Sequence, residues 1–144
     1  MSEKKLKYSV GMFLVFSNLA IIFVIVVLRF LGGFDKEQFT TVLAITIPMF
    51  SGYSTSIIAF IISDRHIKED KSASVTFSYS MLSFIFPIIF TMIILSSIVL
   101  QSYSKVFVDF ADFKSFLITV DSIFASYIGY FIYSMFKMSK RSVK

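Results

Sequence analysis

The sequence predicts an all-α membrane protein with four transmembrane helices and both termini in the cytoplasm. The chain has 144 residues, of which 56% are hydrophobic and 18% aromatic, with a mean hydropathy of +0.81, a composition typical of membrane proteins. Its charges are clustered and leave four long apolar runs. Each run can cross a hydrocarbon core about 30 Å thick, which takes roughly 20 helical residues. We expect a single four-helix transmembrane domain over 1–144, with spans at 8–31, 38–63, 74–101 and 113–137.

The first span follows a basic start, "EKKLK", and carries no formal charge from Tyr8 to Leu28. A cleaved signal peptide is the poorer interpretation, because its apolar region would have roughly 7 to 15 residues and an A-x-A site would follow it. Gly32 and Gly33 are suited to the end of this helix. Asp35 or Glu37 is suited to the first turn of the next one, where the helix dipole favours an acid.

The second and third spans lie in the uncharged runs Gln38–Ser63 and Ser72–Ser104, and both contain residues that form poor helices. Small and hydroxyl-bearing residues recur there every three or four positions, which places them on one face of each helix. Apolar burial gives helices no reason to associate in lipid, so such faces are expected where helices approach closely. The face of the second span comprises Ala44, Pro48, Gly52, Ser56, Ala59 and Ser63, and that of the third comprises Thr76, Ser80, Ser83, Pro87 and Thr91.

Within the fourth span, the run from Ser115 to Phe136 is uncharged except for Asp121, which shares one helical face with Ala125 and Gly129. An ionisable group inside a membrane span is costly and usually faces protein or a water-filled cavity. Asp109 and Asp112 come shortly before this span, where they would add negative charge to an outer mouth.

Two prolines are expected near the depth of this acid. Pro48 and Pro87 each remove a backbone donor and free the carbonyl four residues earlier. A rise of 1.5 Å per residue places both prolines and Asp121 roughly 20 Å from the cytoplasmic face. In one interpretation these residues only pack the bundle, and Asp121 is satisfied by a hydroxyl, by Lys114 or by Arg29. In the other, hydroxyls, freed carbonyls and Asp121 line a hydrated path or a cation site.

The distribution of basic residues predicts the orientation. Cytoplasmic segments are enriched in Lys and Arg, and the side that holds both termini and the connector "DRHIKEDK" has more of them. This bias accounts for the net charge of +5 without a nucleic-acid partner. The inner side would carry Lys4, Lys5, Lys7, Arg65, Lys68, Lys71, Lys137, Lys140, Arg141 and Lys144, and the outer side Arg29, Lys36, Lys105 and Lys114.

The sequence argues against catalysis and against a cofactor. A membrane protease or transferase needs a nucleophile with a base, or a metal cluster, inside the bundle. This chain has no cysteine, and its one histidine, His66, lies in the inner connector as a solvated residue. No glycine-rich phosphate loop and no metal-ligand spacing is present. Asn18, inside the first span, is expected to form an interhelical hydrogen bond.

Short ends, the charged inner connector "DRHIKEDK" after the second span and the outer connector "QSYSKVFVDFADFK" before the fourth define the layout. It resembles several families of small four-span bacterial membrane proteins, among them the small membrane component of temperate-phage exclusion systems such as the lambda Rex system. The resemblance covers the whole chain as topology, includes no diagnostic motif, and transfers no functional residue. It implies an ion channel that depolarises the cell. Small multidrug transporters are less similar, because they depend on a glutamate in the first helix, whereas the first span of this chain contains no acidic residue.

We therefore expect a homo-oligomeric channel or pore-forming protein of the bacterial inner membrane, acting as an anti-phage defence effector that disturbs the membrane potential. Its expected partners are the lipid bilayer and further copies of itself. Two alternatives stay open. One is a non-conducting immunity or accessory subunit that binds the transmembrane helices of another membrane protein. The other is a small transporter with a central site at Asp121.

Overall fold

The computed structural model describes residues 3–64, 77–104 and 106–139, and these form four α-helices. The prediction of an all-helical chain with four helices is confirmed. Within the described part, α1 and α3 are long and apolar enough to cross a membrane, over Lys5–Phe30 and Ser80–Tyr103. The helices are α1 (Glu3–Phe30), α2 (Lys36–Asp64), α3 (Phe77–Ser104) and α4 (Phe110–Ser139).

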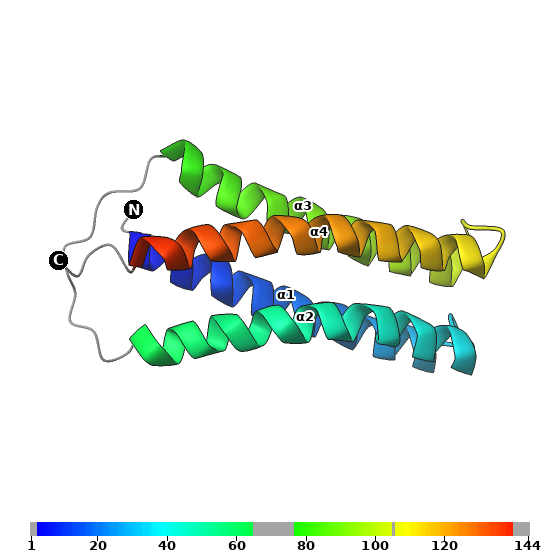
Figure 1. Ribbon diagram of the computed structural model, residues 1–144. Coiled ribbons are helices and arrows are strands. Elements are labelled where there is room, and N and C mark those ends of the chain that lie inside the picture. The colour runs from blue at the N-terminus through cyan, green and yellow to red at the C-terminus, as the bar shows by residue number, and fades with distance from the viewer. Residues whose placement is uncertain (1–2, 65–76, 105, 140–144) are drawn as a thin grey trace.

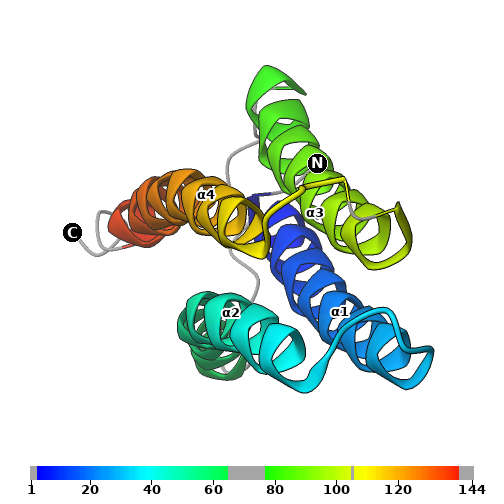
Figure 2. The ribbon, with the colours of Figure 1, turned by 90° about the vertical axis from the view of Figure 1, so that its right-hand side faces the viewer.

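The helices form an antiparallel bundle (Figure 1). Helix α1 packs against α2 and α3, and α4 packs against the same two, so α1 and α4 lie across the bundle from each other (Figure 2). The turn 31–35 and the connection 106–109 lie at the same end, which we call the loop end. Toward the opposite end, α2 and α3 diverge (Figure 1).

The turn between α1 and α2 is fixed by backbone geometry. Gly32 has a φ of 79°, a conformation that glycine adopts without a side-chain clash. Its N–H donates to the carbonyl of Arg29 at 3.1 Å, and the N–H of Gly33 donates to that of Leu28 at 2.9 Å. These two bonds form a Schellman motif, which ends α1 where the sequence predicts it. The Arg29 Nη1 closes the turn by donating to the carbonyl of Phe34 at 2.6 Å.

Side chains also cap the helices that begin at the loop end. Asp35 and Gln38 form a capping box at the start of α2, with the Gln38 N–H donating to Asp35 Oδ1 at 2.7 Å. At the start of α4, Asp109 Oδ1 accepts from the N–H of Ala111 at 3.0 Å. Gln101 on α3 binds both backbone groups of Phe107, accepting from its N–H at 2.9 Å and donating to its carbonyl at 3.4 Å. The loop end is therefore ordered by a small number of polar contacts.

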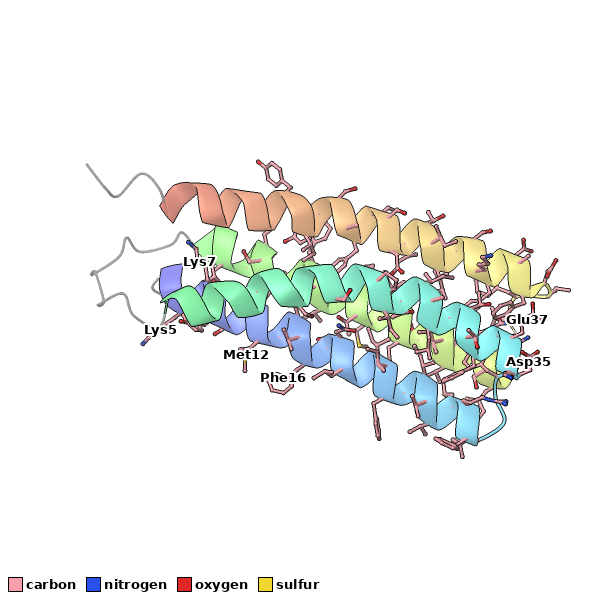
Figure 3. All side chains as sticks on the ribbon, turned by 60° about the horizontal axis from the view of Figure 1, so that its bottom comes forward. Lys5, Lys7, Met12, Phe16, Asp35 and Glu37 are labelled. Atoms are coloured by element: carbon pink, nitrogen blue, oxygen red, sulfur yellow. The ribbon has the colours of Figure 1, made fainter. Side chains whose placement is uncertain are left out.

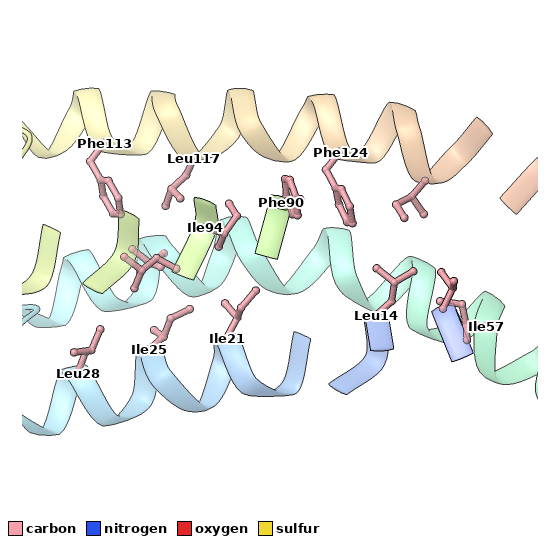
Figure 4. Close-up of a cluster of buried hydrophobic side chains, with 14 of the residues drawn as sticks. Leu14, Ile21, Ile25, Leu28, Ile57, Phe90, Ile94, Phe113, Leu117 and Phe124 are labelled. Atoms are coloured by element: carbon pink, nitrogen blue, oxygen red, sulfur yellow. The ribbon is translucent and has the colours of Figure 1, made fainter. Parts of the chain in front are cut away.

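The core is a stack of apolar side chains that recur every three or four residues on the inward face of each helix. One layer contains Phe90 of α3 stacked on Phe124 of α4, with ring centroids 3.6 Å apart. Dispersion between such closely packed groups is what holds helices together when lipid surrounds them. Figure 4 shows these layers, with Leu14, Ile21, Ile25 and Leu28 from α1, Phe90 and Ile94 from α3, and Phe113, Leu117 and Phe124 from α4.

The close approach of the α1–α2 turn to α3 at the loop end predicts a strong effect of a small substitution. A methyl group at Gly33 would collide with the side chain of Ser102 and lie 3.2 Å from the carbonyl of Leu28. We expect Gly33→Ala to lower the free energy of unfolding in detergent by about 1 to 3 kcal/mol, the usual cost of overpacking. The control is Gly129→Ala, where nothing lies within 4 Å of the added methyl. Equal unfolding midpoints for the two variants would contradict this packing.

Candidate functional site

The structure divides the residues that the sequence assigns to the small-residue faces. Ser83, Pro87 and Asp121 are buried inside the bundle. Others lie at intermediate depth or on the outer surface. Half-buried are Ser80, Thr91 and Ala125; exposed are Ala44, Pro48 and Gly129; and the side chains of Gly52, Ser56, Ala59, Ser63 and Thr76 lie outside the described set.

Six polar side chains of the described residues are buried: Ser83, Gln101 and Ser102 on α3, and one on each of the other three helices. Asn18 on α1 and Asp121 on α4 are each 7% exposed, and Thr46 on α2 is 2% exposed. Thr46 follows Val42 by one helical turn on the inward face of α2. Asn18 and Asp121 likewise continue the apolar faces of α1 and α4, in the series Leu14, Asn18, Ile21, Ile25 and Phe113, Leu117, Asp121, Phe124.

These three residues share one depth. From the loop end, Thr46 is ten residues into α2, Asp121 eleven residues into α4 and Asn18 twelve residues from the end of α1. At 1.5 Å per residue, all three lie roughly 15 to 18 Å from that end, inside the region that hydrocarbon would cover. We call Asn18, Thr46 and Asp121 the polar layer. It places acceptor oxygens from three helices at one level of the core.

Two oxygens of the polar layer have no hydrogen-bond partner. The Thr46 hydroxyl donates to the carbonyl of Val42 at 2.8 Å and so satisfies its proton within α2. The Asn18 Oδ1 and Asp121 Oδ1 are buried and accept no hydrogen bond from the described residues. The interhelical bond predicted for Asn18 is thus not made by its oxygen. A buried polar group without a partner costs about 1 to 3 kcal/mol, and more when it is charged.

The basic partners expected for Asp121 lie elsewhere. Lys114 is exposed, and Arg29 donates to the carbonyl of Phe34 at the loop end. Of the described lysines and arginines whose exposure is known, Lys5, Lys7, Arg29, Lys36 and Lys114, none is buried. Within the same part of the chain there is also no group of three His, Cys, Asp or Glu residues that would hold a metal ion. The packing interpretation with a salt bridge at Asp121 therefore has no support in the described structure.

Only one of the two prolines is level with the acid, because Pro48 lies twelve residues into α2 and Asp121 eleven residues into α4. Phe90 stacks on Phe124, and Phe86 stacks on Tyr127 with ring centroids 4.4 Å apart. These pairs place Pro87 roughly 8 Å from the level of Asp121, toward the end opposite the loops. Pro87 is buried there, whereas Pro48 is exposed on α2. Because Pro87 lies outside the depth of Asp121, one shared layer of two prolines and an acid is not present.

Aromatic side chains join α3 and α4 at this level. Besides the two stacked pairs, the Tyr127 hydroxyl donates to the carbonyl of Leu82 at 3.3 Å. An apolar groove of about 190 Å³ lies beside the pairs and is lined in part by Ile89, Val120 and Ile123. The tyrosine bond satisfies a polar group that would otherwise face hydrocarbon.

The outward face of α4 carries a row of hydroxyl groups. Thr119, Ser122 and Ser126 donate to the carbonyls of Ser115, Ile118 and Ser122 at 2.9, 2.7 and 3.0 Å. Each hydroxyl proton is thus satisfied within the helix. The row has the 4-3-4-3 spacing of a helix seam and lies opposite the inward face that bears Asp121. We call it the hydroxyl seam: Ser115, Thr119, Ser122, Ser126 and Gly129, all exposed.

The two sides of the bundle differ in surface chemistry. Helix α2, which packs beside α4, also exposes small or hydroxyl-bearing residues. Figure 3 shows Met12 and Phe16 pointing away from α1, with Lys5 and Lys7 at one end of the bundle and Asp35 and Glu37 at the other. The small residues exposed on α2 are Thr40, Ala44, Pro48 and Ser51, whereas α1 and α3 expose mainly large apolar residues, among them Phe16, Leu19, Phe23, Met81, Leu82, Ile85, Ile89 and Met92.

The expected outer mouth is only weakly negative. Asp109 and Asp112 are both exposed at the loop end, but Asp109 also caps α4. Lys36 and Lys114 are exposed at the same end, so the described charges there nearly balance.

The chain was compared with models of protein families, with curated proteins and with solved structures, and none of them matches. Its function is therefore inferred from its own residues.

The polar layer predicts that the side chain of Asp121 lowers the stability of the bundle. Replacing an unpaired buried polar group by an apolar one of similar volume removes the cost of burying it. We expect Asp121→Leu to raise the free energy of unfolding in detergent by about 1 to 3 kcal/mol. Its matched control is Leu117→Asp, one turn away on the same inward face, which we expect to destabilise the bundle. A lower unfolding midpoint for Asp121→Leu would mean that the carboxyl group has a stabilising partner.

Proposed function

We propose that the protein spans the bacterial inner membrane four times and forms a homo-oligomeric ion channel that disturbs the membrane potential, as an anti-phage defence effector. The membrane setting is supported by the surfaces of α1 and α3. Only 33% and 28% of their most apolar windows are buried inside the chain. The core helix of a soluble protein of similar hydropathy would be mostly buried, whereas large exposed apolar faces are suited to lipid.

The other two helices are proposed as spans on length and charge. Helix α2 has 29 residues and no formal charge from Gln38 to Ser63. Helix α4 has 30 residues, and its central acid faces the core rather than the surface. Both helices begin at the loop end, level with the last residues of α1 and α3 (Figure 1). The excess of Lys and Arg near the termini and in the 65–71 segment favours a cytoplasmic location for these parts.

The observation on which the channel proposal rests is the hydroxyl seam of α4. A lipid-facing surface needs no small or polar residues, but helices that approach closely do. The seam repeats with the spacing of a helix contact and lies on the side of the bundle that also exposes Ala44 and Pro48. We propose that this side meets further copies of the chain. The core of one bundle is filled by Phe, Leu and Ile side chains, which leaves conduction to the space between chains, lined by hydroxyl groups.

A non-conducting accessory or immunity subunit is the second candidate, because the same small-residue side would fit the transmembrane helix of a different protein. The two candidates differ in what the purified chain does alone. A channel assembles with itself and passes ions, whereas an accessory subunit stays monomeric and leaves a vesicle sealed until its partner is present.

The channel proposal is tested by ion flux from liposomes that contain the purified chain. We expect the wild type to release entrapped monovalent ions, and Ser122→Leu to stop both the release and the self-association, because a leucine would fill the seam. The matched control is Ser96→Leu on α3, where the serine is also exposed and also donates to its own helix, to the carbonyl of Met92 at 2.5 Å. That variant should conduct like the wild type.

Two results would contradict the proposal. Liposomes that stay sealed at every protein density tested would exclude a channel. Equal flux from the Ser122→Leu and Ser96→Leu variants would show that the hydroxyl seam neither joins the copies nor lines the path.

A further inference from the structure

We propose that the polar layer of each chain binds one partly dehydrated alkali-metal cation between the oxygens of Asn18, Thr46 and Asp121. The inference rests on the proposed function for its membrane setting and adds the ion and the site. The proposed cation site is separate from the hydroxyl seam, because the polar layer lies in the core of one bundle and the seam lies on the outer surface of α4.

The unpartnered oxygens point to a cation rather than to packing. Asn18 Oδ1 and Asp121 Oδ1 are both buried and accept nothing from the described residues. They belong to helices on opposite corners of the bundle, and Thr46 lies on α2, which packs against both of those helices. A core built only for packing would place apolar groups at these positions, as it does one turn away at Leu117 and Ile21. Buried acceptors from three helices at one depth are an arrangement that a cation satisfies.

The charge at the layer favours a monovalent ion. Asp121 is the one carboxylate among the three side chains, so a single positive charge neutralises it. Calcium takes six to eight oxygens and usually several carboxylates, and magnesium keeps an octahedral shell rich in water. The described residues contain no cluster of acidic, histidine or cysteine side chains that would add such ligands. An amide, a hydroxyl and one carboxylate therefore match sodium or potassium in charge and in ligand type.

No protein cation takes this place in the described structure. The lysines and arginine of the described part whose exposure is known lie at the bundle ends or on its surface, and none is buried. The Thr46 hydroxyl has used its proton on the carbonyl of Val42, which leaves its lone pairs free to accept or to coordinate. The layer is therefore dominated by acceptors, with the Asn18 amide group as its one remaining donor.

Binding is tested with radioactive sodium on the purified full-length chain in detergent. We expect saturable binding of one ion per chain, displaced by unlabelled sodium or potassium chloride and not by N-methyl-D-glucamine chloride at the same ionic strength. Binding should raise the unfolding midpoint as either alkali salt replaces N-methyl-D-glucamine chloride, because a ligand that binds only the folded state stabilises it.

The variants separate this site from other cation sites. Asp121→Asn keeps the shape of the side chain and should abolish saturable binding. Asn18→Leu and Thr46→Val should each weaken it by roughly tenfold or more, the loss usual when a metal site loses a supporting group. Asp109→Asn, which changes an exposed carboxylate at the loop end, should bind like the wild type. The unfolding midpoint of every variant without alkali salt shows that it is folded.

Each outcome decides for or against the site. Absence of saturable binding in the wild type, or binding that persists in folded Asp121→Asn and Asn18→Leu, overturns the inference. Ion flux without saturable binding also overturns it while leaving the channel in place. Saturable binding in a chain whose liposomes stay sealed upholds the site and refutes the channel.

Discussion

The burial of one carboxyl group in an apolar helical bundle is the constraint on which the rest of this structure depends. Asp121 occupies a position in the inward row of α4 that phenylalanine and leucine fill on either side. In a medium that cannot solvate it, an ionised carboxylate needs a compensating charge or several donors. The described residues provide neither, and an amide oxygen without a partner lies at the same depth. The core is therefore less stable at this level, and this is the level at which we propose a bound cation.

Helix α4 carries different kinds of side chain on its two opposite faces. Its inward face holds the aromatic contacts to α3 and the acid, and its outward face carries the hydroxyl seam, with Ile118 and Ile123 exposed beside it. The hydroxyl protons bind carbonyls of the same helix, so the outward face tolerates lipid in a single chain and water or another helix in an assembly. Because the surfaces of α1 and α3 consist mainly of large apolar residues, the two sides of the bundle suit different neighbours. In the proposed assembly, further copies would therefore bind on the side of α2 and α4.

Sequence reasoning predicted the elements well, and their orientation poorly. Four helices, the glycine end of α1 and the acidic start of α2 followed from local chemistry, since charges, glycine conformation and capping act within a few residues. Which face of each helix points into the core did not follow from the sequence. Ala44 and Ser83 belong to similar small-residue rows, yet one is exposed and the other buried. In a membrane span both faces are largely apolar, so hydropathy does not distinguish the inside from the outside. The hydroxyl seam can be recognised in the sequence from the spacing of Ser115, Thr119, Ser122 and Ser126. The depth of Thr46 in the bundle could be determined only once the structure showed where the helices begin and end.

The proposed channel requires that the hydroxyl seam of α4 faces another copy of the chain. The chain has no cysteine, so single cysteines can be introduced without a competing thiol. Oxidation of membranes that contain Ser122→Cys should give a covalent dimer, because a disulfide forms only when two Cβ atoms approach to roughly 4 Å. Ser96→Cys, on the surface of α3 that is proposed to face lipid, should stay monomeric under the same oxidant. Efficient dimers from Ser96→Cys and none from Ser122→Cys would contradict the claim.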